Sequence, residues 1–394
     1  MQNFTFQLPT KLIFGRDEQK HIGEHLRQAM PGLQKILLHY GGGSIKRSGL
    51  YDEVTASLRE SGIAFAALGG VVPNPRVSLV YEGIGLCRCE DAELILAVGG
   101  GSVIDSAKAI ALGVCREGDV WRMFTEKTPA EKALPVATIL TIPASGSECS
   151  DVSVITNEAE QRKLGYHGEA LRPLLSVVNP ALFATLPKHQ IANGIADIMS
   201  HIFERYFTHT THTDVTDELC EGVLRAVMKN APRVLVNSED YDAWCEIGLA
   251  GTLAHNGLLG RGRQEDWGCH GLEHELSAVY DVAHGAGLAV LTPHWMEYAR
   301  RLNVPLFEQF ARNVMGVTGG RDAEATVLEG IERLRRFFRE MGLPGTLKEL
   351  GIGPERLEEM AKKVTGAAFG NESGRGNFLK LKWQDALKIY RMAL

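Results

Sequence analysis

Short apolar segments alternate with helical patterns through the first half of the chain, and this alternation constrains the fold more than any other feature. Apolar runs of the kind that form buried strands occur at 11–15, 35–40, 63–70, 93–101, 136–143 and 174–180. Helical patterns lie between several of them, at 17–30, 50–61 and 103–113. Strands that alternate with helices form a parallel sheet with helical crossovers. We therefore predict an α/β fold for the first half.

The second half of the chain has a different pattern. After about Pro187, helical patterns follow one another with few β-branched runs, at 190–206, 214–229, 243–259, 323–341 and 355–364. Pro187 is followed by polar residues, which is a typical place for a new helix to begin. A chain of 394 residues is long enough for two domains of ordinary size. We therefore predict an α/β domain over 1–186 and an all-α domain over 187–394.

Composition and charge exclude several classes of protein. Hydrophobic residues make up 44% and charged residues 23% of the chain, which is typical of a soluble globular protein. No apolar run approaches the roughly 18 residues that a membrane helix needs, and the start of the chain lacks the pattern of a signal peptide. The net charge of -6 gives no field that attracts nucleic acid. Seven scattered cysteines without a C-x-x-C pair favour a reducing compartment. We expect a cytoplasmic protein that binds a small molecule, with neither nucleic acid nor membrane as partner.

Two glycine clusters follow predicted strands. HYGGGSIKRSG comes after KILL, and AVGGGSVIDSAKAIA comes after ELIL. Glycine lets the backbone approach a phosphate closely, and a helix start that follows offers free N–H groups. Neither cluster matches the usual Walker or Rossmann spacing, and each alone is equally well explained as a tight turn. Two such loops at the carboxyl ends of strands in one sheet favour a phosphate-containing ligand, because open α/β sheets bind ligands there.

The first glycine loop also indicates which dinucleotide would bind. Sites for NAD often present an Asp or Glu to the adenine ribose. Here the loop consists of glycines and Ser44, followed by Lys46 and Arg47. A 2′-phosphate would meet no repulsion in such a loop, so we expect NADP(H) to be preferred over NAD(H). Lys46 and Arg47 are equally well explained as solvated surface charges.

Four histidines and one aspartate have the spacing of metal ligands. His270 and His274 are i and i+4 on a predicted helix, so they share one face. Asp197 and His201 have the same spacing in a mostly apolar segment, and His284 follows at the start of the next element. A divalent first-row metal accepts carboxylate and imidazole ligands without any thiolate. We interpret the set as a metal site rather than as separate structural residues, and the spacing alone leaves open whether His274 or His284 completes it.

These residues lie in stretches that resemble the iron-containing alcohol dehydrogenase family, within its branch of NADPH-dependent butanol dehydrogenases and aldehyde reductases. The stretches are YGGGSIKRSGLYDEV (40–54), VVPNPRVSLVYEG (71–83), ILAVGGGSVIDSAKAIA (95–111), TIPASGSECSDVSVIT (141–156), NGIADIMSHIFERYF (193–207) and HGLEHELSAVYDVAHGAGLAVLTP (270–293). The resemblance covers nearly the whole chain. It implies a dinucleotide-binding domain at 1–186 and a metal-binding, catalytic helical domain at 187–394, in an architecture like that of dehydroquinate synthase, with the metal in the cleft between them.

The resemblance also implies the roles of individual residues. The metal ligands would be Asp197, His201, His270 and His284, and His274 would be the catalytic, non-ligand histidine beside the substrate. The residues implied in cofactor binding are Gly41, Gly42, Ser44, Asn74, Gly100, Gly101, Ser102, Thr141 and Lys163. NAD-preferring relatives carry an aspartate near Gly41, and its absence here agrees with NADPH.

The predicted function is hydride transfer between NAD(P)H and an aldehyde or primary alcohol of the butanal and butanol type. The metal would polarise the carbonyl oxygen, and the family implies Fe(II), with Zn(II) as the alternative. His274, water or a cofactor hydroxyl would protonate the alkoxide. A polyol dehydrogenase of the glycerol type and a noncatalytic protein that binds nucleotide and metal are alternatives on the same fold. The family leads us to expect a homodimer, with the segment NFTFQLPTKLIFG as a candidate pairing edge.

Overall fold

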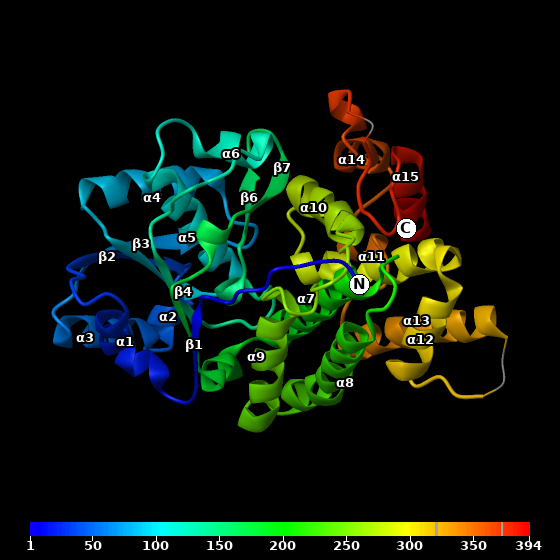
Figure 1. Ribbon diagram of the computed structural model, residues 1–394, viewed down its shortest axis with the longest axis horizontal. Coiled ribbons are helices and arrows are strands. Elements are labelled where there is room, and N and C mark those ends of the chain that lie inside the picture. Colours follow the sequence, from blue (N-terminus) through cyan, green and yellow to red (C-terminus); the bar gives the residue numbers. More distant parts are fainter. Residues whose placement is uncertain (320–321, 372) are drawn as a thin grey trace. The chain divides into compact units, whose positions relative to one another are not determined.

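Six strands form the main sheet of the protein in a computed structural model, which describes residues 1–319, 322–371 and 373–394 (Figure 1). Every neighbouring pair of these strands is parallel, and the order across the sheet is β1-β8-β5-β4-β2-β3. The strands are β1 (Lys11–Phe14), β2 (Lys35–Gly41), β3 (Ala64–Val71), β4 (Leu94–Gly99), β5 (Val136–Leu140) and β8 (Leu175–Val178). Each of the apolar runs overlaps one strand, so the predicted parallel α/β fold is confirmed.

Helices cover both faces of this sheet. On one face, alternate strand residues such as Leu38 and Leu96 pack with α1 (Ile22–Ala29) and α3 (Leu50–Glu60) in one apolar cluster. The intervening residue His39 points to the other face, where its ring contacts Ser106 of α5 (Gly101–Val114). Helix α4 (Val77–Cys89) packs beside α5. Burial on two faces explains why these strands are almost continuously apolar in sequence.

A two-stranded antiparallel sheet was not predicted from the sequence. Its strands are β6 (Val152–Asn157) and β7 (Arg162–His167). The strand β7 carries charged and polar residues and only one face of the hairpin is apolar, which makes its sequence look like a loop. Two short helices, α2 (Ser44–Arg47) and α6 (Val120–Glu126), also belong to this part of the chain.

The second half of the chain is helical, as predicted. The helices are α7 (Lys188–Tyr206), α8 (Asp214–Val236), α9 (Tyr241–His255), α10 (Gly268–Tyr280), α11 (His284–Ala299), α12 (Val304–Asn313), α13 (Ala323–Glu340), α14 (Leu357–Val364) and α15 (Trp383–Met392). Helix α7 packs against α8 and α11, and α10 packs against α11 and α14. No helix within the described ranges has the length and apolar character of a membrane span.

The chain separates into two compact units that differ in two segments from the expected division at 186 and 187. One unit consists of Gln7–Leu186 and Ser238–Asn256, and the other of Met1–Phe6, Pro187–Asn237 and Gly257–Leu394. The helix α9 therefore belongs with the α/β unit, where the Trp244 ring meets the edge of the Phe183 ring at a centroid distance of 5.6 Å. Gly248 of the same helix lies against Phe183, Phe14 and Val178. Contacts of this kind between distant segments are not visible in a helical pattern.

Candidate functional site

Asp197 and His201 lie one turn apart on α7, as their i, i+4 spacing predicts. Both are 5% exposed. The Nδ1 atom of His201 lies 2.9 Å from the Asp197 carbonyl oxygen and 3.1 Å from Oδ1 of the same residue. A carbonyl oxygen only accepts hydrogen bonds, so a neutral His201 ring carries its proton on Nδ1. This tautomer leaves the lone pair on Nε2, the atom that would bind a metal.

His270 is held in the first turn of α10 by a carboxylate from α7. The Glu204 Oε1 atom accepts hydrogen bonds from Nδ1 of His270 at 2.9 Å and from its backbone N–H at 2.8 Å. The Nε2 atom of His270 faces the other way and lies 3.9 Å from Asp197 Oδ1. Burial lowers the pKa of His270 well below its ordinary value, and the neighbouring His201 and His284 lower it further. The ring is therefore neutral, as a metal ligand must be.

His284 is the first residue of α11 and has the same kind of partner. Its Nδ1 atom contacts the carboxylate of Glu273, which is fully buried and also accepts a hydrogen bond from the Ser277 hydroxyl. Its Nε2 atom lies 3.7 Å from Asp197 Oδ1. The imidazoles of His270 and His284 thus approach one carboxylate oxygen with their Nε2 atoms and present their Nδ1 atoms to glutamates.

The convergence of these side chains has the chemistry of a metal site. The ligand atoms of Asp197, His201 and His270 lie within 4.8 Å of one another. His270 Nε2 is buried and has no hydrogen-bond partner in the described part of the protein, a state that costs about 1–3 kcal/mol for a polar group. Asp197 Oδ1 is also buried, with His201 Nδ1 at 3.1 Å. A cation between them would satisfy both atoms, and one carboxylate with three imidazoles is a donor set that first-row divalent metals accept. The residues fit the metal that the resemblance implies.

The charge on Asp197 is stabilised by the surrounding histidines. Burial by itself raises the pKa of the Asp197 carboxyl, but His201, His284 and His270 lower it by more, so the pKa lies well below its ordinary range. The carboxylate is therefore ionised at neutral pH. An ionised oxygen at the centre of the cluster is the strongest attraction for a cation in the site.

His274 lies beside this cluster, one turn after His270 on α10. Its ring centroid is 5.6 Å from that of His284 and 6.5 Å from that of His270. His274, Glu273 and His284 also form a group of close metal-ligating atoms, but the Glu273 carboxylate already binds His284 and Ser277. This geometry puts His274 next to the Asp197 site.

Glycines allow α11 to approach close enough to deliver His284. A Cβ atom on Gly285 would overlap the backbone carbonyl of Asn193 in α7, and a Cβ on Gly287 would come within 2.8 Å of the Glu273 side chain. Gly285 does not tolerate a side chain without movement of the backbone, and a side chain at Gly287 would displace the Glu273 side chain. The run HGAG that begins α11 is therefore a packing requirement of the histidine cluster.

The Trp267 ring packs against the histidine cluster, and the Trp267 backbone has a strained conformation. Its φ angle is 65°, which costs a non-glycine residue about 1 kcal/mol or more. The ring centroid lies 5.2 Å from that of His270 and 5.9 Å from that of His201, and the Arg205 guanidinium lies 4.8 Å from the ring centroid. The Glu204 Oε2 atom accepts the Trp267 backbone N–H at 2.7 Å, which helps to hold the strained residue.

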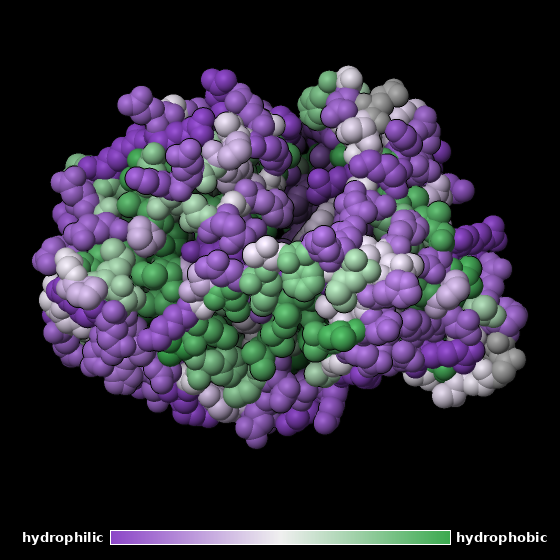
Figure 2. Space-filling model, in the orientation of Figure 1, coloured by the Kyte–Doolittle hydropathy of each residue, from purple (hydrophilic) through white to green (hydrophobic). Residues whose placement is uncertain are grey.

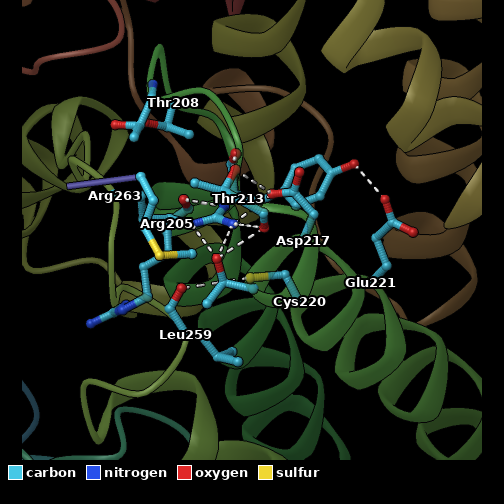
Figure 3. Close-up of polar contacts among 12 residues, drawn as sticks. Arg205, Thr208, Thr213, Asp217, Cys220, Glu221, Leu259 and Arg263 are labelled. Atoms are coloured by element: carbon cyan, nitrogen blue, oxygen red, sulfur yellow. Dashed lines mark hydrogen bonds and ion pairs between the residues drawn. The ribbon is translucent and has the colours of Figure 1, made fainter. Parts of the chain in front are cut away.

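A buried arginine, Arg263, holds the C-terminal end of α7, the helix that carries Asp197 and His201 (Figure 3). The Arg263 guanidinium contacts the carboxylate of Asp217 and the hydroxyl of Thr216 in α8 and donates to the carbonyl oxygens of Arg205 and Thr213. Its side chain is completely buried. The network joins the end of α7, the start of α8 and the loop before α10, and therefore supports the helices on which the cluster is built.

Both halves of the chain match one family of enzymes. Residues 9–180 match the family described as iron-containing alcohol dehydrogenase, and residues 191–394 match the C-terminal region of the Fe-containing alcohol dehydrogenase family. The chain is 42% identical over 395 residues to NADH-dependent butanol dehydrogenase A of Clostridium acetobutylicum, with 99% of each chain covered.

More distant relatives and solved structures agree with this match. An NADPH-dependent aldehyde reductase of Escherichia coli is 33% identical, with 92% of this chain and 93% of that protein covered. The crystal structure of NADH-dependent butanol dehydrogenase A from Thermotoga maritima superimposes with a TM-score of 0.95 at 40% identity, covering 100% of this chain and 99% of that one.

The chain belongs to the iron-containing alcohol dehydrogenase family. The predicted family and its architecture are confirmed, and so is the predicted class of enzyme, an NAD(P)-dependent oxidoreductase of alcohols and aldehydes. The family implies one divalent metal and a nicotinamide cofactor. The roles of the individual residues, and the choice between NADH and NADPH, stay predictions.

The residues that the family resemblance implies in cofactor binding lie at the carboxyl ends of the parallel strands or beside them. Gly41 ends β2, Asn74 follows β3, Gly100 follows β4 and Thr141 follows β5. The others are Gly42 in the loop after β2, Ser44 at the start of α2, Gly101 and Ser102 at the start of α5, and Lys163 in β7. Lys163 Nζ donates to Asn74 Oδ1 at 2.9 Å, so two residues far apart in sequence meet at one end of the sheet.

A buried lysine holds the loop that follows Thr141. Lys108 of α5 is fully buried, and its ammonium group donates to the carbonyl oxygens of Ser147, Ser150 and Val152 at 2.7 to 2.9 Å. Burial lowers the pKa of Lys108 to about 8. Nearby acidic groups, of which Asp105 has the largest effect, raise the pKa and oppose this shift. This burial was not predicted from the sequence, because a lysine in a helix is usually exposed.

Sequence reasoning also missed the two glutamates of the histidine cluster. Glu204 follows His201 by three residues, and Glu273 follows His270 by three residues. This repeated H-x-x-E pattern puts each glutamate on the same helix face as the histidine before it. The pattern was the one sequence feature that could have indicated a role for the glutamates beside the histidines. The structure shows a different pairing, because Glu204 binds His270 and Glu273 binds His284. Each glutamate therefore supports the histidine of the next helix.

Proposed function

We propose that this protein transfers hydride between NAD(P)H and an aldehyde or primary alcohol of the butanal and butanol type, at a divalent metal ion bound by Asp197, His201, His270 and His284. The observation that carries the proposal is the convergence of the His270 and His284 Nε2 atoms on Asp197 Oδ1, at 3.9 and 3.7 Å, with the buried His270 Nε2 lacking a hydrogen-bond partner in the described ranges. A catalytic zinc or iron site uses the same donors, which are carboxylate oxygen and imidazole nitrogen.

A divalent metal supplies Lewis acidity, which polarises a carbonyl oxygen and stabilises the negative charge that develops on it during hydride transfer. Asp197 contributes one negative charge and the imidazoles contribute none, so the four side chains leave the site with a net positive charge when it is loaded. We propose Fe(II) as the native ion because of the family, and Zn(II) fits the same donors.

We propose that His274 moves the proton that the product alcohol needs. The support is its position beside His284 and the ordinary pKa of histidine, which suits a general acid near neutral pH. Replacement of His274 by alanine would then flatten the pH dependence of turnover while metal binding stays intact. Unchanged turnover and pH dependence would remove His274 from this role.

We propose NADP(H) as the preferred cofactor. Gly41 ends β2, the turn that follows contains Gly42 and Gly43, and Ser44 begins α2, so this segment presents no carboxylate to a 2′-phosphate. Space supports the same choice, because a Cβ atom on Gly42 would meet nothing within 4 Å. The relatives named butanol dehydrogenases are NADH-dependent and the related aldehyde reductase is NADPH-dependent. The ratio of kcat/KM for the two cofactors tests the proposal, and Gly41→Asp should shift it toward NADH by charge repulsion. A wild-type preference for NADH would overturn it.

We propose a homodimer that pairs along β1. This strand is an edge of the six-stranded sheet, and edge strands present unpaired backbone groups. Leu8, Phe14 and Leu249 are 38%, 36% and 43% exposed, and Figure 2 shows hydrophobic side chains over the elements labelled β1 and α9 in Figure 1. The mass in solution by light scattering tests the dimer, and a monomer would contradict it.

The free state of all seven cysteines supports a reducing location such as the cytoplasm. We therefore propose a cytoplasmic enzyme. Cell fractionation with antibodies against this chain is the test, and recovery from an oxidising compartment would refute the location.

The decisive experiment is the initial rate of NADPH and NADH oxidation with butanal after anaerobic loading with Fe(II). We expect turnover in the loaded protein, background rates after chelation, and background rates for His201→Ala. The matched control is His209→Ala, because His209 hydrogen-bonds the carbonyl of Phe378 in the same unit but lies outside the cluster. Activity on glycerol instead of butanal would replace the proposed substrate by a polyol. Inactivity with every aldehyde and alcohol would leave a noncatalytic binding protein.

A further inference from the structure

Two carboxylates hold the histidines of the cluster, and they do so in different ways. Glu204 is 4% exposed and Glu273 is completely buried. Both carboxylates contact an Nδ1 atom, but Glu204 also accepts two backbone N–H groups at the start of α10. This difference allows the role of each carboxylate to be separated by substitution.

The carboxylate of Glu204 is surrounded by donors on both oxygens. Oε1 accepts from the backbone N–H and from Nδ1 of His270, and Oε2 accepts from the backbone N–H of Trp267 at 2.7 Å. A group with two acceptor oxygens satisfies all three donors. Because Nδ1 must donate to a carboxylate, the neutral ring keeps its proton there and directs the Nε2 lone pair at Asp197.

We propose that Glu204 is a positioning residue for the metal. It fixes the tautomer and the orientation of His270 and fixes the first turn of α10 at the same time. The inference rests on the proposed function, since it assumes that His270 binds the ion through Nε2. Glu204 contacts the Nδ1 side of the ring, whereas Nε2 is the atom that faces Asp197.

A glutamine at position 204 cannot reproduce this arrangement. If its amide oxygen faces His270, its NH2 group faces the donating N–H of Trp267. If its NH2 group faces His270 instead, Nδ1 must become an acceptor and the proton moves to Nε2, where it blocks the metal. In the first orientation the NH2 group opposes the Trp267 N–H, and in the second it opposes the His270 backbone N–H. Glu204→Gln should therefore weaken metal binding roughly 10- to 100-fold, which is the usual effect of losing an outer partner of a metal-bound histidine.

A glutamine at position 273 can keep its contacts. Its amide oxygen would accept from His284 Nδ1, and its NH2 group would donate to the Ser277 hydroxyl, which would then donate to the carbonyl of Val282 at 3.3 Å. Glu273→Gln should therefore weaken metal binding less than Glu204→Gln does. The difference between two buried Glu→Gln changes follows from donor geometry and not from loss of charge alone.

The experiment is competition of each protein with a chromogenic chelator for Zn(II), which gives the dissociation constant of the metal without any activity measurement. The variants are Glu204→Gln, Glu273→Gln and the control Glu221→Gln. Glu221 is as buried, but it accepts from Tyr206 and Gln309 and not from a histidine. We expect a large loss for position 204, a smaller one for 273 and none for 221. Equal affinity of Glu204→Gln and wild type for zinc would overturn the inference about Glu204 and leave the proposed function standing.

A second measurement needs no variant at position 204. Nitrogen NMR of the metal-free wild-type protein with labelled histidine reports which ring nitrogen carries the proton, and His270→Ala assigns the signal. We expect His270 to be protonated on Nδ1, and a proton on Nε2 would overturn the inference even if Glu204→Gln fails to fold. A wild-type protein that binds no zinc in the competition would overturn the proposed function together with the inference.

Discussion

The pH dependence of stability should depend on one buried histidine that is not part of the histidine cluster. His39 of β2 is completely buried. Its Nδ1 lies 2.9 Å from the carbonyl of Leu68, and its Nε2 lies 2.9 Å from the hydroxyl of Ser106. Because the carbonyl accepts the Nδ1 proton, the neutral ring accepts the serine hydroxyl on Nε2. The perturbation is a change of pH from 7 to 5, in wild type and in His39→Gln.

The magnitude follows from the pKa of this group. Burial lowers the pKa of His39 from 6.5 to about 4, although the hydrogen bond to Leu68 opposes the shift. Below pH 6.5 the His39 side chain of the unfolded chain therefore binds a proton, whereas the same side chain in the folded protein binds one only when the pH approaches 4. Stability from this group is complete above pH 6.5 and is lost as the pH falls toward 4. The loss is about 2 kcal/mol at pH 5 and about 3 kcal/mol near pH 4.

The assay is urea unfolding of the chelator-treated protein at both pH values. A glutamine at position 39 offers an N–H for Leu68 and a carbonyl oxygen for Ser106, but it does not titrate. All other groups titrate equally in the two proteins and cancel in the comparison. We therefore expect wild type to lose about 2 kcal/mol more than His39→Gln between pH 7 and pH 5. Equal losses in the two proteins would refute the reasoning.

Three further predictions concern packing and buried polar groups. Gly285→Ala puts a methyl group against the carbonyl of the facing helix, and should cost about 1–3 kcal/mol in thermal unfolding and weaken zinc binding; an unchanged Tm would contradict the overlap. Arg263→Met leaves Asp217 without its buried partner, so urea unfolding should show a loss of about 3–5 kcal/mol, and a loss below about 1 kcal/mol would argue against it. Lys108→Met exposes three carbonyl oxygens to an apolar side chain, so fluorescence titration should show weaker NADPH binding, while equal affinity would show that the loop is held by other contacts.

Much of the fold is visible in the sequence because the governing patterns are local. The apolar runs that became β2 and β4 are buried on both faces, so they needed no knowledge of their neighbours to be identified as strands. The pairs Asp197 with His201 and His270 with His274 share a helix face because the rise of a helix is fixed. The sharing of a helix face by these side chains was therefore predictable from spacing, and the metal site that they would form stays a prediction.

Other features depended on which segments meet. The position of α9 with the α/β unit depends on Trp244 packing against Phe183, and a helical pattern is the same wherever the helix docks. The hairpin of β6 and β7 was overlooked because its polar strand resembles a loop until its partner is known. Lys108 looked like a surface lysine until the loop at Ser147 surrounded its ammonium group.

The histidine cluster shows most clearly which features follow from the sequence and which depend on packing. Residue types and helical spacing determined by themselves that imidazoles and a carboxylate would gather on α7 and α10. Only the tertiary structure decided that His284 directs its Nε2 at Asp197, and that Glu204 and Glu273 support histidines of neighbouring helices. The physical reason is that periodicity fixes directions within one helix, whereas the distance between helices is set by packing, here by glycines such as Gly285 that let two backbones come into contact.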